Sequence, residues 1–316
     1  MFFTRRELMQ TATVAAFAGQ TMKAESAEQG AWQKFFPQGF RQERVKTSGA
    51  EINTLVGGSG PPLLLFHGAP QSLITWRLIA PELAKEFSLV LCDLRGYGDS
   101  STPPDGERHK NYSKSALALD GVEVMKHFGH ERFFMAGHDR GGRVGTRMAL
   151  DHPGKVLKLA VLDIVPAHYL YSHVTIEFVQ AYFHWFNYLR PSPGPENDLK
   201  ATNEAALAKA TEEVQREYLR TSSRMENIHA MCEDYRASAS IDLDQDNADF
   251  SSGKKIQCPV LALWAAAGAM GKQFDVLSIW KQEGVNVTGK GLPGNHSLQE
   301  SAPKETLAEL VKFFHA

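Results

Sequence analysis

The sequence predicts an α/β fold in which helices cover both faces of a mostly parallel, eight-stranded sheet. Short apolar runs alternate along the chain with segments of helical periodicity, as in sheets built from strand–helix–strand units. Several runs, such as PPLLLF and LVLC, are apolar at every position, which is typical of strands buried on both faces. A long helical region, 166–250, interrupts the alternation before the last two strands.

The strands and helices can be placed individually. A turn at Gly49 joins the first two strands, and glycine ends the third. The helices have apolar residues three and four positions apart. The predicted strands are 41–48, 51–58, 61–68, 88–94, 132–137, 158–165, 259–264 and 285–290. The predicted helices outside the insertion are Ile74–Phe87, 113–129, Arg140–Leu150 and Pro303–Phe314.

Composition narrows the class of protein. The chain has 316 residues, 43% of them hydrophobic and 22% charged, which suits one large globular domain with an insertion. A net charge of −2 argues against a partner such as nucleic acid or a membrane surface. The three cysteines, Cys92, Cys232 and Cys258, show no CxxC spacing, so we expect neither a disulfide nor a metal site. Cys92 lies in a predicted strand and Cys258 begins the run CPVLALW, which we also expect to be a strand, and both are expected to be small buried side chains.

The first thirty residues differ from the rest. The pair Arg5–Arg6 precedes the mildly apolar run TATVAAFAG, which ends in a small-residue site at 16–18. This pattern predicts a twin-arginine signal peptide over 1–30 and export to the periplasm. The alternative is an N-terminal arm on a cytoplasmic protein. The apolar run is too short to span a bilayer.

The chain after the leader divides into a core and a cap. We expect the core to comprise 31–165 and 251–316, and the cap to comprise 166–250. Such an insertion covers the carboxyl edge of the sheet, where open α/β sheets bind their ligands. A separate helical domain is the alternative, but no flexible linker flanks the region.

The pentapeptide Gly137-His138-Asp139-Arg140-Gly141 follows a predicted strand and opens a helix. This is the context of a nucleophile elbow, whose glycines allow strand and helix backbones to approach closely. The central residue is usually serine, and here it is Asp139 at a helix N-terminus, where the dipole favours an anion. A charged turn residue without a chemical role is the alternative.

The partners of such a nucleophile are a histidine and an acid. His296 lies between the last strand and the last helix, where the base of α/β-hydrolases is found. Asp163 ends the strand KLAVLD and is our preferred acid. The alternative, Asp275, is expected to point outward from a helix.

Aspartate suits a different reaction from serine, because it is already ionised at neutral pH and displaces leaving groups from saturated carbon. The product is an ester on Asp139, which water activated by His296 hydrolyses. The backbone N–H groups of Ala69 and Arg140 are the expected oxyanion donors. Halides and epoxide oxygens are the plausible leaving groups.

Two arginines, Arg140 and Arg143, share one face of the following helix. A substrate carboxylate about 4 Å from Asp139 would be repelled by roughly 4 kcal/mol at an effective dielectric constant of about 20. Guanidinium groups would neutralise and orient such a carboxylate. The alternative is that one or both arginines pair with carboxylates of the cap.

From about Phe35 to the C-terminus, the chain closely resembles the fluoroacetate (haloacetate) dehalogenase family of α/β-hydrolases. The motifs are GHDRGGRVG, HGAPQS, FHWF, MCEDYRA and LALW. The resemblance implies an Asp139 nucleophile, an Asp163–His296 pair, and carboxylate binding by Arg140 and Arg143. It also implies that halide is bound by His184, Trp185 and Tyr235, which from the residues alone would be packed cap side chains. No cofactor is implied, and a homodimer is expected.

The chain departs from this family at Ala69, Leu73 and the stretch WAAAG, and its cap is shorter, all of which predicts a wider site. The leading hypothesis is hydrolytic dehalogenation of short 2-haloacids. Epoxide hydrolysis with the same three residues is the alternative. A capped binding protein without catalysis is a remote second alternative.

Overall fold

The computed structural model describes residues 31–316, so the predicted leader over 1–30 lies outside the described residues. Residues 31–38 group separately and contain one short 3-10 helix, η1 (Ala31–Lys34). Residues 39–316 form one compact unit that holds every other element described below. Within residues 31–316, no helix is both long and apolar enough to cross a membrane.

The predicted eight-stranded, mostly parallel sheet is confirmed. The strand order is β1-β2-β4-β3-β5-β6-β7-β8, with β2 antiparallel to β1 and β4 and all later pairings parallel. The strands are β1 (Arg41–Lys46), β2 (Glu51–Gly57), β3 (Pro62–Phe66), β4 (Ser88–Cys92), β5 (Phe133–His138), β6 (Val156–Leu162), β7 (Val260–Ala265) and β8 (Val287–Leu292). The central strands are buried on both faces, as their continuous apolar runs predict.

Helices cover both faces of the sheet. Because β4 and β5 lie on opposite sides of β3, right-handed crossovers place α2 and α3 on opposite faces. Helices α3 and α4 pack together, and α4 rests on β5 and β6, while α2 packs against α15. The core helices are α2 (Ala80–Leu83), α3 (Lys114–His127), α4 (Arg140–Asp151), α12 (Ala269–Gln273), α13 (Val276–Glu283), α14 (Leu298–Ser301) and α15 (Pro303–His315), with 3-10 helices η2 (Leu73–Trp76) and η3 (Glu107–Tyr112).

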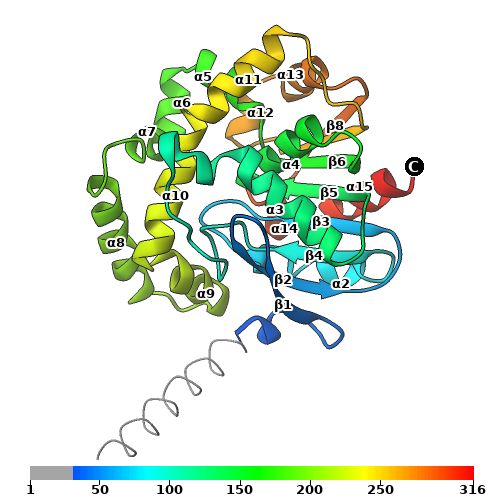
Figure 1. Cartoon of the computed structure of the whole chain (residues 1–316), viewed down its shortest axis with the longest axis horizontal. Coiled ribbons are helices and arrows are strands. Elements are labelled where there is room, and N and C mark those ends of the chain that lie inside the picture. The colour runs from blue at the N-terminus through cyan, green and yellow to red at the C-terminus, as the bar shows by residue number, and fades with distance from the viewer. Residues whose placement is uncertain (1–30) are drawn as a thin grey trace, which may run out of the picture. The chain divides into compact units, whose positions relative to one another are not determined.

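A helical cap follows the sixth strand, as predicted. Its helices, drawn green to yellow in Figure 1, gather on one side of the sheet. They are α5 (Ala167–Ser172), α6 (Ile176–Ala181), α7 (Phe183–Asn187), α8 (Gly194–Leu207), α9 (Glu213–Ser222), α10 (Met225–Ser238) and α11 (Ile241–Ser251). Helix α10 contributes a nearly continuous run of buried residues, so it is the central helix of the cap.

Two details of the prediction are wrong. The predicted helix Ile74–Phe87 is instead η2 followed by the short α2. Pro81, in the first turn of α2, has no N–H to continue a helix from the preceding turn, so the helical pattern is interrupted there. Cys258 lies just before β7 rather than within it, while Cys92 ends β4, and all three cysteines are free.

Candidate active site

The turn between β5 and α4 forces an unusual backbone on Asp139. Its φ of 46° and ψ of −115° lie in a region that L-residues rarely adopt. A Cβ on Gly137 would lie 2.4 Å from the Gly141 carbonyl group, and a Cβ on Gly141 would lie 2.5 Å from the His67 carbonyl oxygen. The glycines of the motif are therefore needed for close packing, which projects Asp139 from a sharp turn.

The Asp139 carboxylate is 6% exposed and points back toward the loop after β3. Its Oδ2 accepts a hydrogen bond of 3.1 Å from the backbone N–H of Ala69, one of the two predicted oxyanion donors. The other, the Arg140 N–H, donates no hydrogen bond to this carboxylate within residues 31–316. Burial raises the pKa of Asp139, but neighbouring positive charges, His296 foremost, hold it below the usual value. The carboxylate is therefore ionised at neutral pH.

Asp163 and His296 lie together at the same edge of the sheet. Asp163 follows β6 directly, with a φ of 54°, and its Oδ2 lies 2.6 Å from Nδ1 of His296. Its other oxygen accepts a 2.8 Å hydrogen bond from the Ala265 N–H, and the side chain is 1% exposed. The alternative acid, Asp275, is exposed at the start of α13, where it accepts a hydrogen bond from the Ser278 N–H. Asp163 is therefore the acid that contacts the histidine.

Arg140 is fully buried and faces the cap. Its Nε donates to the Asp234 carboxylate at 2.6 Å, and its Nη2 donates to Ser238 at 2.6 Å. Its Nη1 is buried and has no hydrogen-bond partner among residues 31–316. One of the two arginines thus pairs with a cap carboxylate, as the alternative interpretation expects, yet keeps one nitrogen unoccupied.

Arg143 has no carboxylate within 4 Å among residues 31–316. Its Nη1 donates to the Val165 carbonyl oxygen at 3.1 Å, while its Nε is buried and has no partner in the described part of the chain. Burial and the nearby Arg140 charge both lower the pKa of Arg143. A buried guanidinium without a counter-ion is costly, so a site of this kind is suited to an anion supplied from outside.

The three predicted halide ligands lie beside these arginines. The ring centroids of His184 and Trp185 lie 5.9 Å and 5.8 Å from that of Tyr235. The Arg140 guanidinium lies 4.0 Å from the Tyr235 centroid, and the Arg143 guanidinium lies 4.8 Å from the Trp185 centroid. Burial lowers the pKa of His184 and raises that of Tyr235, so the imidazole is neutral and the phenol keeps its proton. Both are then hydrogen-bond donors.

Comparison with known proteins shows the family of this chain. The family model described as alpha/beta hydrolase fold matches residues 61–300. A fluoroacetate dehalogenase of Burkholderia sp is 41% identical over 288 residues, covering 87% of this chain and 94% of that protein. The chain belongs to the fluoroacetate dehalogenase family of α/β-hydrolases.

Other relatives of this hydrolase are named for a different reaction or for the fold alone. A soluble epoxide hydrolase of Corynebacterium sp. (strain C12) is 28% identical, covering 84% of this chain and 94% of that protein. The crystal structure of an alpha/beta hydrolase from Nostoc sp PCC 7120 is 46% identical with a TM-score of 0.84, covering 87% of this chain and 98% of that one.

Sequence reasoning missed the residues that hold this hydrolase's site in place. His138 directly precedes the nucleophile and contacts the loop that carries His296. Its Nε2 is 2.9 Å from the His296 carbonyl oxygen, its Nδ1 is 3.1 Å from Gln71 Oε1, and the centroid of its ring is 4.7 Å from that of His296. His138 thus ties the loop of the histidine to the turn of the nucleophile. The motif GHDRGG contained the signal, but only the fold shows what His138 contacts.

Asp234 is the second missed residue. It is fully buried and accepts from Arg140, from Lys114, and from the Tyr97 hydroxyl at 2.7 Å. Burial raises the pKa of Asp234, but the charges of Arg140 and Lys114 hold it well below the ordinary range. Asp234 therefore links the cap to the core through an ionised carboxylate, and fixes the orientation of Arg140.

Replacing Asp234 with Asn is expected to lower the free energy of unfolding by about 3 kcal/mol, because two buried cations lose their counter-ion. Urea denaturation at neutral pH measures this. The matched control is Asp244→Asn, whose partner Arg108 is exposed, and its effect should stay below about 1 kcal/mol. Similar small losses in both variants would show that the buried network contributes little.

Proposed function

We propose that this hydrolase cleaves the carbon–halogen bond of short 2-haloacids such as haloacetates, fluoroacetate among them. The observation that carries the proposal is a pair of buried nitrogens on α4, Arg140 Nη1 and Arg143 Nε, that have no hydrogen-bond partner within the described residues. A substrate carboxylate supplies the acceptor that both lack. With that charge neutralised, Asp139 can approach an anionic substrate without the repulsion of roughly 4 kcal/mol expected at about 4 Å.

The reaction has two chemical steps. An oxygen of Asp139 attacks the halogen-bearing carbon, the carbon–halogen bond breaks, and halide departs with the bonding electron pair. Water then attacks Cγ of the resulting ester while His296 takes its proton, and the 2-hydroxyacid leaves as Asp139 is restored. Oδ2 already lies at the Ala69 N–H, so that oxygen is suited to carry the negative charge of the tetrahedral intermediate. Asp163 orients the imidazole and stabilises its charged form.

The departing halide needs hydrogen-bond donors in a site with little water. His184, Trp185 and Tyr235 can each donate one. Trp185 and Tyr235 are 3% exposed, and the arginines beside them add positive charge. Fluoride is the most demanding leaving group, since its strong hydration has to be replaced by these donors.

Epoxide hydrolysis is the second candidate, favoured by the similarity to an epoxide hydrolase and by the phenol of Tyr235. Halide release from fluoro-, chloro- and bromoacetate and 2-halopropionates, run beside a panel of epoxides, separates the two. We expect halide from the acids. Diol from epoxides without halide release would overturn the proposal, and inertness toward both panels would favour a binding protein.

The pH dependence of ester hydrolysis tests the role of His296. In the free enzyme burial lowers the pKa of His296, but the hydrogen bond to Asp163 and the Asp139 charge raise it above the ordinary value. The ester has no charge on Asp139, so the pKa should fall when the base is needed. As the pH is lowered, ester decay should therefore slow only at pH values below the pKa that His296 has in the free enzyme. Rapid-quench measurements of ester decay and an NMR titration of the free enzyme give the two pKa values of His296. Coinciding values would contradict the influence of the Asp139 charge, and ester decay that does not slow at low pH would contradict the role of His296 as the base.

We propose further that residues 1–30 are a twin-arginine signal and that the enzyme acts in the periplasm. The support is the Arg5–Arg6 pair followed by a mildly apolar run. Changing both arginines to lysine in a bacterial host should keep the protein in the cytoplasm. Unchanged export would refute the assignment. A homodimer, expected from the family resemblance, is tested by light scattering on purified protein.

A further inference from the structure

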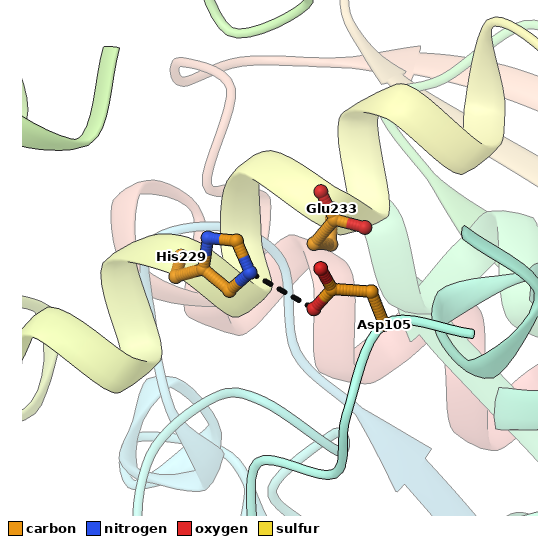
Figure 2. A group of neighbouring side chains, drawn as sticks. All are labelled: Asp105, His229 and Glu233. Atoms are coloured by element: carbon orange, nitrogen blue, oxygen red, sulfur yellow. Dashed lines mark hydrogen bonds and ion pairs between the residues drawn. The ribbon is translucent and has the colours of Figure 1, made fainter. Parts of the chain in front are cut away.

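A second group of titratable side chains lies where the loop after β4 passes helix α10. Asp105 belongs to this loop, while His229 and Glu233 are four residues apart on α10 and so share one face of the helix (Figure 2). One ligand atom from each lies within 4.8 Å of the others. The sequence predicts no metal site, because Asp105 and His229 are 124 positions apart and only the fold brings them together.

The surroundings of this group are rich in carboxylates. His229 Nε2 lies 2.9 Å from Asp105 and its Nδ1 lies 3.2 Å from Glu196. Glu233 contacts His109 Nδ1 at 2.6 Å through one oxygen and Arg236 at 2.7 Å through the other. Two carboxylates of this group, Glu196 and Glu233, thus share the guanidinium of Arg236.

Glu196 shows the same shortage of positive charge directly. It is 1% exposed, yet no residue from 31 to 316 donates a hydrogen bond to its buried Oε2. Its Oε1 serves both His229 and Arg236. A buried carboxylate oxygen without a donor is costly, so an additional cation would stabilise the group.

The group is open to solvent on one side. Asp105, His109, His229, Glu233 and Arg236 line a surface hollow. The side chains of Asp105, His109 and His229 are 45%, 34% and 33% exposed. An ion therefore has a route of entry, and the exposed side chains can rotate toward it.

We infer that Asp105, His229 and Glu233 form a binding site for a divalent transition-metal ion such as Zn²⁺, with His109 as a fourth ligand. Imidazole nitrogen and carboxylate oxygen are ligands that zinc accepts in tetrahedral sites. Ligand atoms about 2.1 Å from such an ion lie roughly 3.4 Å from one another. The three ligand atoms, which lie within 4.8 Å of one another, therefore have to move closer together, which rotation of the exposed side chains allows.

The ion would connect the two parts of the hydrolase. Asp105 and His109 precede α3 in the core, whereas His229 and Glu233 belong to the cap. Glu233 is followed directly by Asp234, which orients Arg140. The bound ion would therefore fasten the turn of α10 that reaches the active site, as a structural ion with no part in the chemistry.

The test uses the untagged full chain after treatment with EDTA. Titration with ZnCl₂ in a calorimeter should give one site per chain, and zinc should raise the melting temperature in a concentration-dependent way. His229→Gln should weaken zinc binding at least roughly tenfold. Co²⁺ in place of zinc should give the visible spectrum of a site with nitrogen and oxygen ligands.

His127→Gln is the matched control. His127 contacts one surface carboxylate, Glu43, at 2.6 Å, but belongs to no group of three ligands among residues 31–316. The His127→Gln variant should bind zinc with the same affinity as the unmodified chain. No saturable zinc binding, or equal affinity in the His229 and His127 variants, would overturn the site. A melting temperature that changes with pH but not with zinc would show that protonated histidines supply the missing charge instead.

Discussion

Replacing His296 with Asn is expected to stop the reaction after its first chemical step, with substrate attached to Asp139. The first step needs only the ionised carboxylate, which the site keeps charged. The second step needs a base for water, and loss of general-base catalysis costs roughly 10²–10⁴-fold. Mass spectrometry of the peptide containing Asp139, after mixing with haloacetate, should show the mass of the ester. An absence of adduct under these conditions would count against the two-step mechanism.

His315→Asn provides the control for this experiment. His315 is also half exposed and also paired with a carboxylate, Glu86, but lies at the end of α15. It should turn over normally and accumulate no ester. A second measurement follows the oxygen atoms: a single turnover in ¹⁸O-labelled water should leave the label on Asp139 rather than in the product. Label in the product of the first turnover would indicate direct attack by water.

The sequence was sufficient to predict the fold and which residues meet at the sheet edge. Parallel strands end at the same edge, so residues placed directly after β3, β5, β6 and β8 had to come together there. Asp139 follows its strand directly, and Asp163 follows the next one. The contact between Asp163 and His296 could therefore be predicted from the sequence alone.

The parts that could not be predicted depend on the packing of cap against core. Asp234 lies 94 residues from Arg140, and nothing in the local pattern shows that a cap carboxylate accepts a hydrogen bond from its Nε. Likewise, nothing in the local pattern shows that His229 contacts Asp105. Periodicity places a residue on a face of its own helix, but which side chain of another element meets it depends on the angle between elements.

Replacing Arg143 with Met is expected to reduce kcat/KM for haloacetates by about 10³-fold. The reason is the repulsion of roughly 4 kcal/mol between two carboxylates about 4 Å apart, which the guanidinium offsets. Neutral haloacetamides, with no charge to neutralise, should lose less than about tenfold. Steady-state kinetics on both substrates measure the difference. Arg143→Lys keeps the charge without the two-pronged geometry, so it should recover part of the activity on the acids.

The stability of the Arg143→Met variant separates this role from a structural one. Burial and the Arg140 charge lower the pKa of Arg143, which means that the folded state disfavours its charged form. Its side chain makes one hydrogen bond, to the Val165 carbonyl oxygen, and no ion pair within the described residues. Removing the charge should therefore leave the free energy of unfolding unchanged or raise it, although activity falls. A loss of several kcal/mol in stability, with equal losses on acids and amides, would show that Arg143 holds the fold rather than the substrate.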